Sequence, residues 1–287
     1  MLKYLLAALA AFLPLAASAQ APARFSVTVE GAGPDVIMIP GLTSARRVWD
    51  GAVESLDGRY RVHRIQIAGF GGEPAGPNSE GPLLENVVGE LHDYIAANRL
   101  DRPMIVGHSI GGLLALMLAQ RHPDDVGRAL IVDALPFYGL LFGADATVAS
   151  VEPRAAAFRD MIAAMSDDAW RTQQQAGLAS LVANEAARPA LLEDSMRSDR
   201  RVVARALYED IVTDVRPGLA AMRTPLTIVY AVNPYATEER FGRLMRDGYA
   251  AAPGVSFVAV EPSHHFIMLD QPARFAAILA DFLAGPE

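Results

Sequence analysis

The sequence alternates between two kinds of segment, and this alternation limits the possible folds more than any other feature. Short apolar stretches rich in β-branched residues lie at 24–30, 35–40, 60–69, 103–108 and 128–133. Helix-like segments separate them at about 44–55, 82–99 and 110–121. The two stretches at 103–108 and 128–133 are apolar at almost every position, as in parallel strands covered on both faces. The pattern predicts an α/β protein with a doubly wound, mostly parallel sheet.

The alternation stops between residues 134 and 219. This segment contains only helix-like stretches rich in Ala, Met, Gln and Arg. Strands and helices then resume at 226–232, 237–250, 255–261 and 272–284. In open α/β sheets the ligand crevice lies at the carboxyl ends of the strands, where such an insertion would sit. We therefore predict a core made of 20–133 and 220–287, with a helical cap at 134–219 inserted between two sheet strands.

The first 19 residues have the layout of a secretory signal peptide. A short start containing Lys3 precedes an apolar run at 4–16, and Ala17-Ser18-Ala19 forms a cleavage pattern before Gln20. The apolar run is shorter than the roughly 20 residues that a spanning helix needs. We expect cleavage near Ala19/Gln20, export to the periplasm or the medium, and no stable insertion into a membrane.

Charge and composition argue against several classes of partner. The formal net charge is −8, whereas nucleic-acid partners favour basic surfaces. The chain has no cysteine, so it forms no disulfide. It also lacks a P-loop, an H-E-x-x-H motif and acidic clusters at metal-ligand spacing. We expect no cofactor, no metal and no nucleic-acid partner.

Ser109 lies in Gly107-His108-Ser109-Ile110-Gly111, which fits the pattern G-x-S-x-G. The pattern follows an apolar strand and opens an apolar helix, which is the context of a nucleophile elbow. A serine in this sharp turn has strained backbone angles, and glycines remove side chains that would collide with the adjoining strand and helix. The alternative is a helix N-cap serine between two packing glycines.

The chain resembles the α/β-hydrolase family over nearly its whole mature length. The resemblance is carried by "IPGLTS" (39–44), "GHSIGG" (107–112), the helical insertion and "HHFIMLDQP" (264–272). It implies that the backbone N–H groups of Leu42 and Ile110 form an oxyanion hole beside Ser109. Capped members usually have His-Gly-x in the first of these loops, and Pro40 replaces that histidine here.

The general base is assigned to His265. A base must lie on a loop at the same sheet edge as the nucleophile, and His264 and His265 follow the last strand. The family has an acidic residue five positions after its histidine and a proline seven positions after it. Asp270 and Pro272 stand at these distances from His265, which favours it over His264.

The acid that orients this base is less clear from the sequence. Most of the family has Asp-Pro after the penultimate strand, but this chain has Asn233-Pro234. Haloalkane dehalogenases and certain lactonases take the acid from the strand after the elbow helix instead, and here that strand ends at Asp133. We assign the acid to Asp133. Asn233 in a charge-free role, and Glu238 or Glu239 reaching back, are the alternatives.

Together these residues predict an exported serine hydrolase that cleaves a carboxylic ester or lactone through an acyl-enzyme on Ser109. A small or medium hydrophobic substrate is expected, because the cap offers several apolar side chains for a pocket. These candidates are Phe137, Tyr138, Leu140, Leu141, Phe142, Met161 and Met165. For each one taken singly, a place in the core of the cap is the favoured alternative. A perhydrolase, a carbon–carbon bond hydrolase and a non-catalytic ligand-binding protein are the alternatives.

Overall fold

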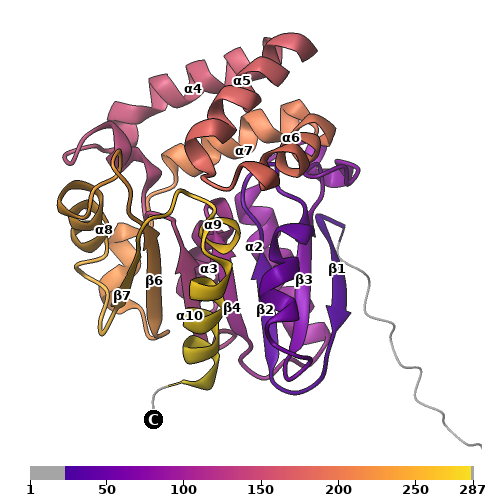
Figure 1. The fold of residues 1–287 in the computed structure, drawn as a ribbon, viewed down its shortest axis with the longest axis vertical. Coiled ribbons are helices and arrows are strands. Elements are labelled where there is room, and N and C mark those ends of the chain that lie inside the picture. The colour runs from indigo at the N-terminus through magenta and orange to yellow at the C-terminus, as the bar shows by residue number, and fades with distance from the viewer. Residues whose placement is uncertain (1–22, 286–287) are drawn as a thin grey trace, which may run out of the picture.

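A seven-stranded sheet forms the centre of the computed structural model, which describes residues 23–285 (Figure 1). The strands are β1 (Phe25–Glu30), β2 (Asp35–Ile39), β3 (Arg61–Ile67), β4 (Met104–His108), β5 (Arg128–Val132), β6 (Leu226–Ala231) and β7 (Ser256–Val260). Their order in the sheet is β1-β3-β2-β4-β5-β6-β7. Only β1 runs antiparallel to its neighbour, β3; the other pairs are parallel. The predicted doubly wound, mostly parallel sheet is confirmed. The expected signal peptide lies outside the described residues.

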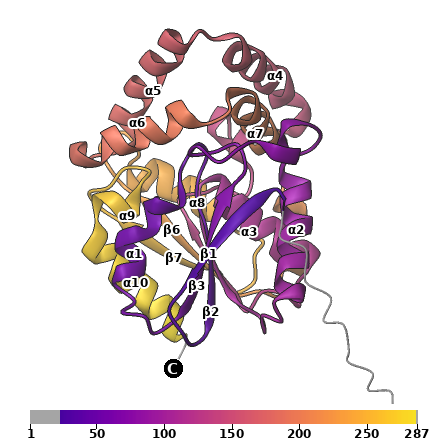
Figure 2. The same cartoon turned by 90° about the vertical axis from the view of Figure 1, so that its right-hand side faces the viewer.

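Helices cover both faces of the sheet, as the edge-on view shows (Figure 2). On one face lie α2 (Leu84–Ala97) and α3 (Ile110–Arg121), and on the other lie α1 (Asp50–Glu54), α9 (Ile267–Asp270) and α10 (Pro272–Ala284). Strand β2 sends Ile37 and Ile39 into one apolar core and Val36 and Met38 into the other. All four are fully buried, and such burial stabilises the fold by about 1.5–3 kcal/mol for each large side chain.

Four further helices lie between β5 and β6 and form a layer above the carboxyl ends of the strands (Figure 1). They are α4 (Val148–Ala164), α5 (Asp167–Leu181), α6 (Arg188–Arg197) and α7 (Arg200–Val212). Three short 3-10 helices accompany them: η3 (Tyr138–Phe142), η4 (Glu185–Ala187) and η5 (Arg216–Ala221). The side chains of Thr147, Ser166 and Asp199 accept backbone N–H groups at the starts of α4, α5 and α7, which satisfies donors that a helix cannot pair internally.

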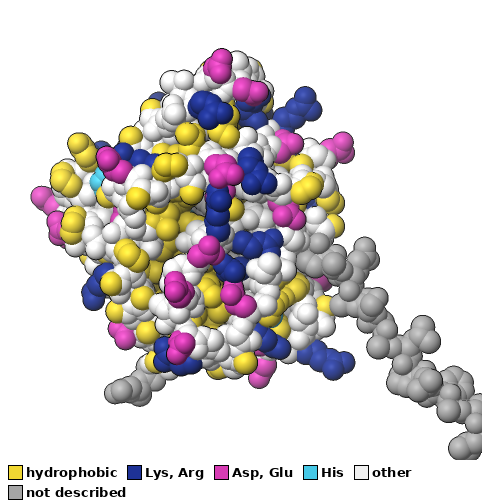
Figure 3. Space-filling model, turned by 45° about the vertical axis from the view of Figure 1, so that its right-hand side comes forward, with side chains coloured by type: hydrophobic (Ala, Val, Ile, Leu, Met, Phe, Trp, Pro, Cys, Tyr) yellow, Lys and Arg dark blue, Asp and Glu magenta, His cyan; other side chains and the backbone are white. Residues whose placement is uncertain are grey.

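Two predicted helices differ in detail from the observed ones. The segment at 44–55 forms a 3-10 helix, η1 (Arg46–Trp49), before α1, and the segment at 237–250 forms a π-helix, η6 (Glu238–Gly242), before α8 (Arg243–Gly248). A 3-10 turn, η2 (Gly76–Ser79), lies between β3 and α2. Across residues 23–285, the structure contains no helix that is long and apolar enough to cross a bilayer. On the face shown in Figure 3, positive and negative side chains are interspersed.

Candidate active site

Ser109 stands at the junction of β4 and α3 with φ 55° and ψ −127°. A positive φ is uncommon for a residue other than glycine and marks local strain. The strain is held by the neighbouring strand, because the Ser109 N–H donates a 2.9 Å hydrogen bond to the carbonyl of Val132 at the end of β5. The sequence context thus forms a strand–turn–helix with the serine at its turn.

Glycines permit this turn because backbone crowds both of their α-carbons. A Cβ at Gly107 would overlap the carbonyl of Gly111, and a Cβ at Gly111 would overlap the carbonyl of Ile39 on β2. The fully buried start of α3 therefore packs directly on two strands, with no space for a side chain. This packing fixes the direction in which Ser109 projects.

Asp133 immediately follows β5 and is hydrogen-bonded to His265. The Nδ1–H of His265 donates to Asp133 Oδ2 at 2.7 Å, and the N–H of Ala231 on β6 donates to Asp133 Oδ1 at 2.9 Å. The aspartate side chain is only 6% exposed, and its backbone has φ 48°. Two donors therefore fix both carboxylate oxygens. With Nδ1 occupied, Nε2 of His265 is the nitrogen left for proton exchange.

The other acid candidates make different contacts. Asn233 Oδ1 accepts the N–H groups of Tyr235 and Ala236 in a tight turn, and Asn233 Nδ2 donates to the Ser263 carbonyl. Glu238 Oε1 accepts the hydroxyl of Tyr230 and also pairs with Arg246. Within the part of the chain that the structure describes, neither Asn233, Glu238 nor Glu239 is hydrogen-bonded to His265.

Asp270 holds the loop that carries the two histidines. Its Oδ2 accepts the backbone N–H of His264 at 2.8 Å, and its Oδ1 accepts the backbone N–H of Asn184 at 2.9 Å. Asn184 lies in the loop after α5, so this carboxylate joins the cap to the base loop. The ring of His264, in contrast to that of His265, has a buried Nδ1 without a hydrogen-bond partner among the described residues.

His108 supports His265 from below. Its ring is fully buried, lies 4.5 Å from the His265 ring between centroids, and uses Nε2–H to donate to the His265 carbonyl at 3.0 Å. Burial, with a smaller contribution from the nearby His265, holds the pKa of His108 well below its usual range. A neutral imidazole with its proton on Nε2 therefore braces the backbone of the candidate base.

The two candidate oxyanion donors belong to segments next to Ser109: the loop after β2 and the first residue of α3. The loop after β2 passes so close that a Cβ on Gly41 would lie 3.2 Å from the Cβ of Ser109. Leu42 follows in that loop, and Ile110 begins α3. The N–H groups of Leu42 and Ile110 donate to no acceptor among residues 23–285. Both are free to bind a developing negative charge.

These groups border a cavity of about 370 Å³ between the sheet and the cap. Its lining includes Ser109, His265 and Asp133, together with apolar side chains from the cap. Those apolar residues are Tyr138, Leu141, Ile162, Trp170, Leu178, Leu181, Val203 and Leu207. Gln173, Gln174 and the buried carboxyl of Asp210 also line it.

The expected pocket lining is only partly right. Tyr138 and Leu141 do line the cavity. Phe137 and Leu140 do not line it and are buried in the apolar core, as the alternative to a pocket role had it. The prediction for Met161 is wrong, because this side chain is 43% exposed. Phe142 and Met165 pack partly buried against the core instead. Asp210 was missed, although it follows Val203 and Leu207 at helical spacing and so falls on the same buried stripe of α7.

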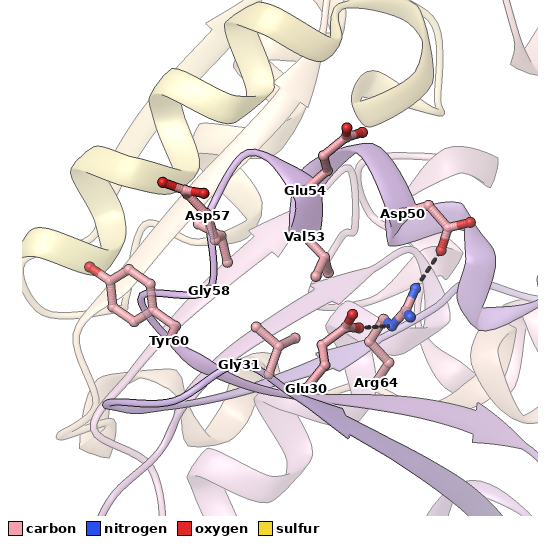
Figure 4. Close-up of a pocket in the computed structure, with 11 residues that line it drawn as sticks. Glu30, Gly31, Asp50, Val53, Glu54, Asp57, Gly58, Tyr60 and Arg64 are labelled. Atoms are coloured by element: carbon pink, nitrogen blue, oxygen red, sulfur yellow. Dashed lines mark hydrogen bonds and ion pairs between the residues drawn. The ribbon is translucent and has the colours of Figure 1, made fainter.

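Two other places on the molecule bring titratable side chains together. A more open hollow at the β1–β3 edge is lined by Glu30, Asp50 and Glu54, and Arg64 pairs with Glu30 and Asp50 (Figure 4). It contains no histidine or serine. It therefore lacks the candidate nucleophile and the candidate base that line the cavity under the cap.

His92, His122 and Asp125 form a cluster that the sequence did not suggest. The rings of His92 and His122 stack 3.9 Å apart at an interplanar angle of 15°, and Asp125 accepts from Nδ1 of His92. Imidazole lone pairs lie in the ring plane. Two nearly parallel rings therefore do not aim their nitrogens at one point, as a shared metal ion requires.

Comparisons with known proteins agree with this fold. The model of the alpha/beta hydrolase family matches residues 36–278, and the chain belongs to that family. A pimeloyl-(acyl-carrier protein) methyl ester esterase of Aromatoleum aromaticum is 28% identical over 276 residues, which cover 88% of this chain and 99% of that protein. The enol-lactonase of Burkholderia xenovorans LB400 has the same fold, with a TM-score of 0.72 at 18% identity over 91% of this chain and 96% of its own.

Another relative has a higher sequence identity over a shorter segment. A pimeloyl-(acyl-carrier protein) methyl ester esterase of Aeromonas hydrophila subsp. hydrophila is 35% identical over 115 residues. This match covers 39% of the present chain and 43% of the relative's length.

Proposed function

We propose that the protein is a serine hydrolase that cleaves a carboxylic ester or lactone through an acyl-enzyme on Ser109. Family membership and the esterases among its relatives support hydrolysis of an ester bond. The observation that carries the serine mechanism is the hydrogen bond between Asp133 and Nδ1 of His265, at the rim of the cavity that Ser109 borders. An imidazole oriented in this way is what a serine nucleophile requires.

The chemistry follows from the placement of these groups. Ser109 Oγ attacks the ester carbonyl while Nε2 of His265 accepts the hydroxyl proton. The Leu42 and Ile110 N–H groups bind the oxyanion, and loss of one such donor typically costs ~10²–10³ in turnover. Collapse of this intermediate expels the alcohol, which takes the proton from His265. Water, deprotonated by His265, then attacks the acyl-enzyme; the bond to Ser109 Oγ breaks, Oγ takes the proton back from His265, and the acid is released.

A fluorophosphonate probe tests this proposal, because it reacts with activated serines. We expect one adduct on Ser109 that is absent in Ser109→Ala. His265→Ala should abolish labelling and ester turnover, whereas the neighbouring His264→Ala serves as a matched control that retains both. Labelling that survives in Ser109→Ala, or its complete absence in the wild type, would contradict the mechanism and favour a binding protein.

Product analysis separates the alternative reactions on the same fold. Esters and lactones should yield the free acid and alcohol at a rate that hydrogen peroxide does not change. Formation of a peracid in the presence of peroxide would indicate a perhydrolase. Cleavage of a carbon–carbon bond in a substrate whose ester analogue is inert would indicate the other alternative.

We also propose that the protein is exported after cleavage near Ala19/Gln20, and that 134–219 acts as a cap domain over the core. The charged start, the apolar run and the A-x-A pattern of 1–19 support export. Expression of the full chain followed by N-terminal sequencing of the product should give Gln20 as the first residue. A product that keeps Met1 and remains inside the cell would contradict it.

A further inference from the structure

Asp210 is a buried carboxyl group for which the proposed chemistry has no role. It lies on α7 and is only 7% exposed. Its carboxyl accepts no hydrogen bond from the residues that the structure describes, and it borders the cavity under the cap. Buried polar groups are nearly always hydrogen-bonded, so the partner of this carboxyl group must come from what occupies the cavity, either water or a ligand. A positively charged donor on a ligand would satisfy the carboxylate better than water does.

Asp210 lines the same cavity as the reacting groups but lies on a different layer of the fold. Val203 and Leu207 of the same helix face also line the cavity, and they precede Asp210 by seven and three positions. The helix belongs to the layer above the carboxyl ends of the strands (Figure 1), whereas Ser109 and His265 belong to loops that follow β4 and β7 of the sheet. A substrate bound at Ser109 therefore extends towards a carboxyl group surrounded by apolar side chains.

The cavity contains no lysine or arginine, among the described residues that line it, to pair with this carboxyl group. Its lining, as far as the described residues form it, includes the carboxyl groups of Asp133 and Asp210 but no lysine or arginine. Asp133 is already paired with His265. A substrate with its own carboxylate would meet unfavourable charge here, whereas an ammonium group would supply the counter-charge and hydrogen-bond donors that Asp210 lacks.

We propose that Asp210 binds the ammonium group of a substrate, so that the enzyme prefers esters or lactones whose acyl or alcohol part carries a protonated amine. This inference rests on the proposed function. Asp210 acts as a specificity-determining residue and takes no part in proton transfer. A hydroxyl group in the same place would gain less, because its hydrogen bond to the carboxylate involves one charge and not two.

Two titratable groups, His265 and Tyr138, interact electrostatically with Asp210 and bear on how its charge changes with pH. Burial raises the pKa of Asp210 to about 7, and the neighbouring His265 opposes this shift. Burial, with the charge of Asp210 as the smaller cause, raises the pKa of Tyr138 to about 12, so the phenol stays neutral. Ammonium binding should therefore weaken as the pH falls through about 7 and Asp210 becomes protonated.

Other charged groups around α7 are engaged elsewhere. Glu209 accepts the N–H groups at the start of α2, and Arg205 donates to the carbonyls of Asn78 and Gly81. On α4, which packs against α7, Glu152 accepts the hydroxyl of Tyr208. These groups are bonded outside the cavity, so Glu152→Gln removes a carboxylate from the cap without changing the cavity lining.

The test uses p-nitrophenyl esters whose acyl chains end in an ammonium, hydroxyl, methyl or carboxylate group, prepared at several chain lengths. We expect kcat/KM for the ammonium ester to exceed that for the methyl ester by about 10- to 100-fold at the best length, as expected for a hydrogen bond to a charged group. The carboxylate ester should be the poorest substrate. Asp210→Asn should remove the preference while the methyl ester is still hydrolysed, and Glu152→Gln should leave it unchanged.

A second measurement does not depend on the variant folding. In the wild type, the ratio of kcat/KM for ammonium and methyl esters should fall as the pH decreases through about 7, and protonation of His265 cancels in this ratio. A wild type that prefers methyl esters at every length, or an unchanged ratio in folded Asp210→Asn, overturns the role of Asp210 alone. Failure to hydrolyse any ester, with no fluorophosphonate adduct, overturns the proposed function itself.

Discussion

Replacing Asp210 by asparagine should stabilise the protein, and the gain should grow with pH. The wild-type carboxyl has its pKa raised from 3.8 to about 7 by burial in the folded state. Between these values the folded protein holds a proton that the unfolded chain has lost. Unfolding therefore becomes easier as the pH rises through this window, and above about pH 7 the full cost is present.

The size of the effect follows from the same shift. One pKa unit corresponds to about 1.36 kcal/mol, so a rise from 3.8 to about 7 amounts to about 4 kcal/mol as an upper limit. At about pH 5, the wild type has lost only the share of unfolding free energy that corresponds to the rise in pH from 3.8 to 5. A further loss of about 2–3 kcal/mol is therefore expected between about pH 5 and about pH 8. Asparagine has nearly the same shape as aspartate. Because its amide does not titrate, its effect on the free energy of unfolding is the same at both pH values.

Urea denaturation of the wild type and Asp210→Asn at about pH 5 and about pH 8 measures this difference. The stability gain of the variant should be about 2–3 kcal/mol larger at the higher pH. Glu152→Gln, which removes an exposed carboxylate from the same cap, should show no such dependence. A gain that is equal at both pH values, or a loss that deepens at the higher one, would refute the view of Asp210 as a buried, unpaired acid.

Three further perturbations test the site. Asp133→Asn should lower kcat by about 10⁴-fold, because an amide can hold the wrong tautomer of the base, whereas Asn233→Ala should cost far less in the same assay; the reverse order would mean that the acid is misassigned. Gly41→Ala places a Cβ 2.8 Å from Nδ1 of His108, so turnover should fall by about 10²-fold or more while the circular dichroism spectrum is kept. Asp270→Ala removes two hydrogen bonds to a charged group, and the free energy of unfolding should fall by about 3 kcal/mol; an unchanged denaturation midpoint would show that these bonds contribute nothing.

Much of the fold could be predicted from local patterns in the sequence. Each of the seven strands begins and ends within two residues of its predicted range, because apolar β-branched runs between turn residues are a strong signal. The turn at Ser109 could also be predicted, since only glycine fits where α3 touches β2 and β4. The helix boundaries around 46–54 and 238–248 were less accurate, because 3-10 and π turns have no distinct hydrophobic period.

The site was harder to predict where it depends on how distant elements dock. The sequence leaves Asp133, Asn233 and Glu238 open, and only the packing of β5 beside β6 shows that Asp133 receives the Ala231 N–H and meets His265. Asp210 had no local signal beyond its place on an apolar stripe. A charged residue on such a stripe is buried or exposed according to the way α7 lies over the cavity, and short-range patterns do not contain that information.

The source of the acid also affects how this scaffold can change. Ser109 and Asp133 follow adjacent strands, and the bond from the Ser109 N–H to Val132 ties these strand ends together. With the acid assigned to Asp133, the loop after β6 supplies no reacting group, but Asn233 both closes its turn and donates to the Ser263 carbonyl beside the two histidines. Exchanged sequences at 234–237 that keep Asn233 should be tolerated with little loss of turnover, whereas loss of Asn233 also removes its bond to Ser263. Natural variation and directed evolution can therefore change 234–237 without changing the residues that line the cavity.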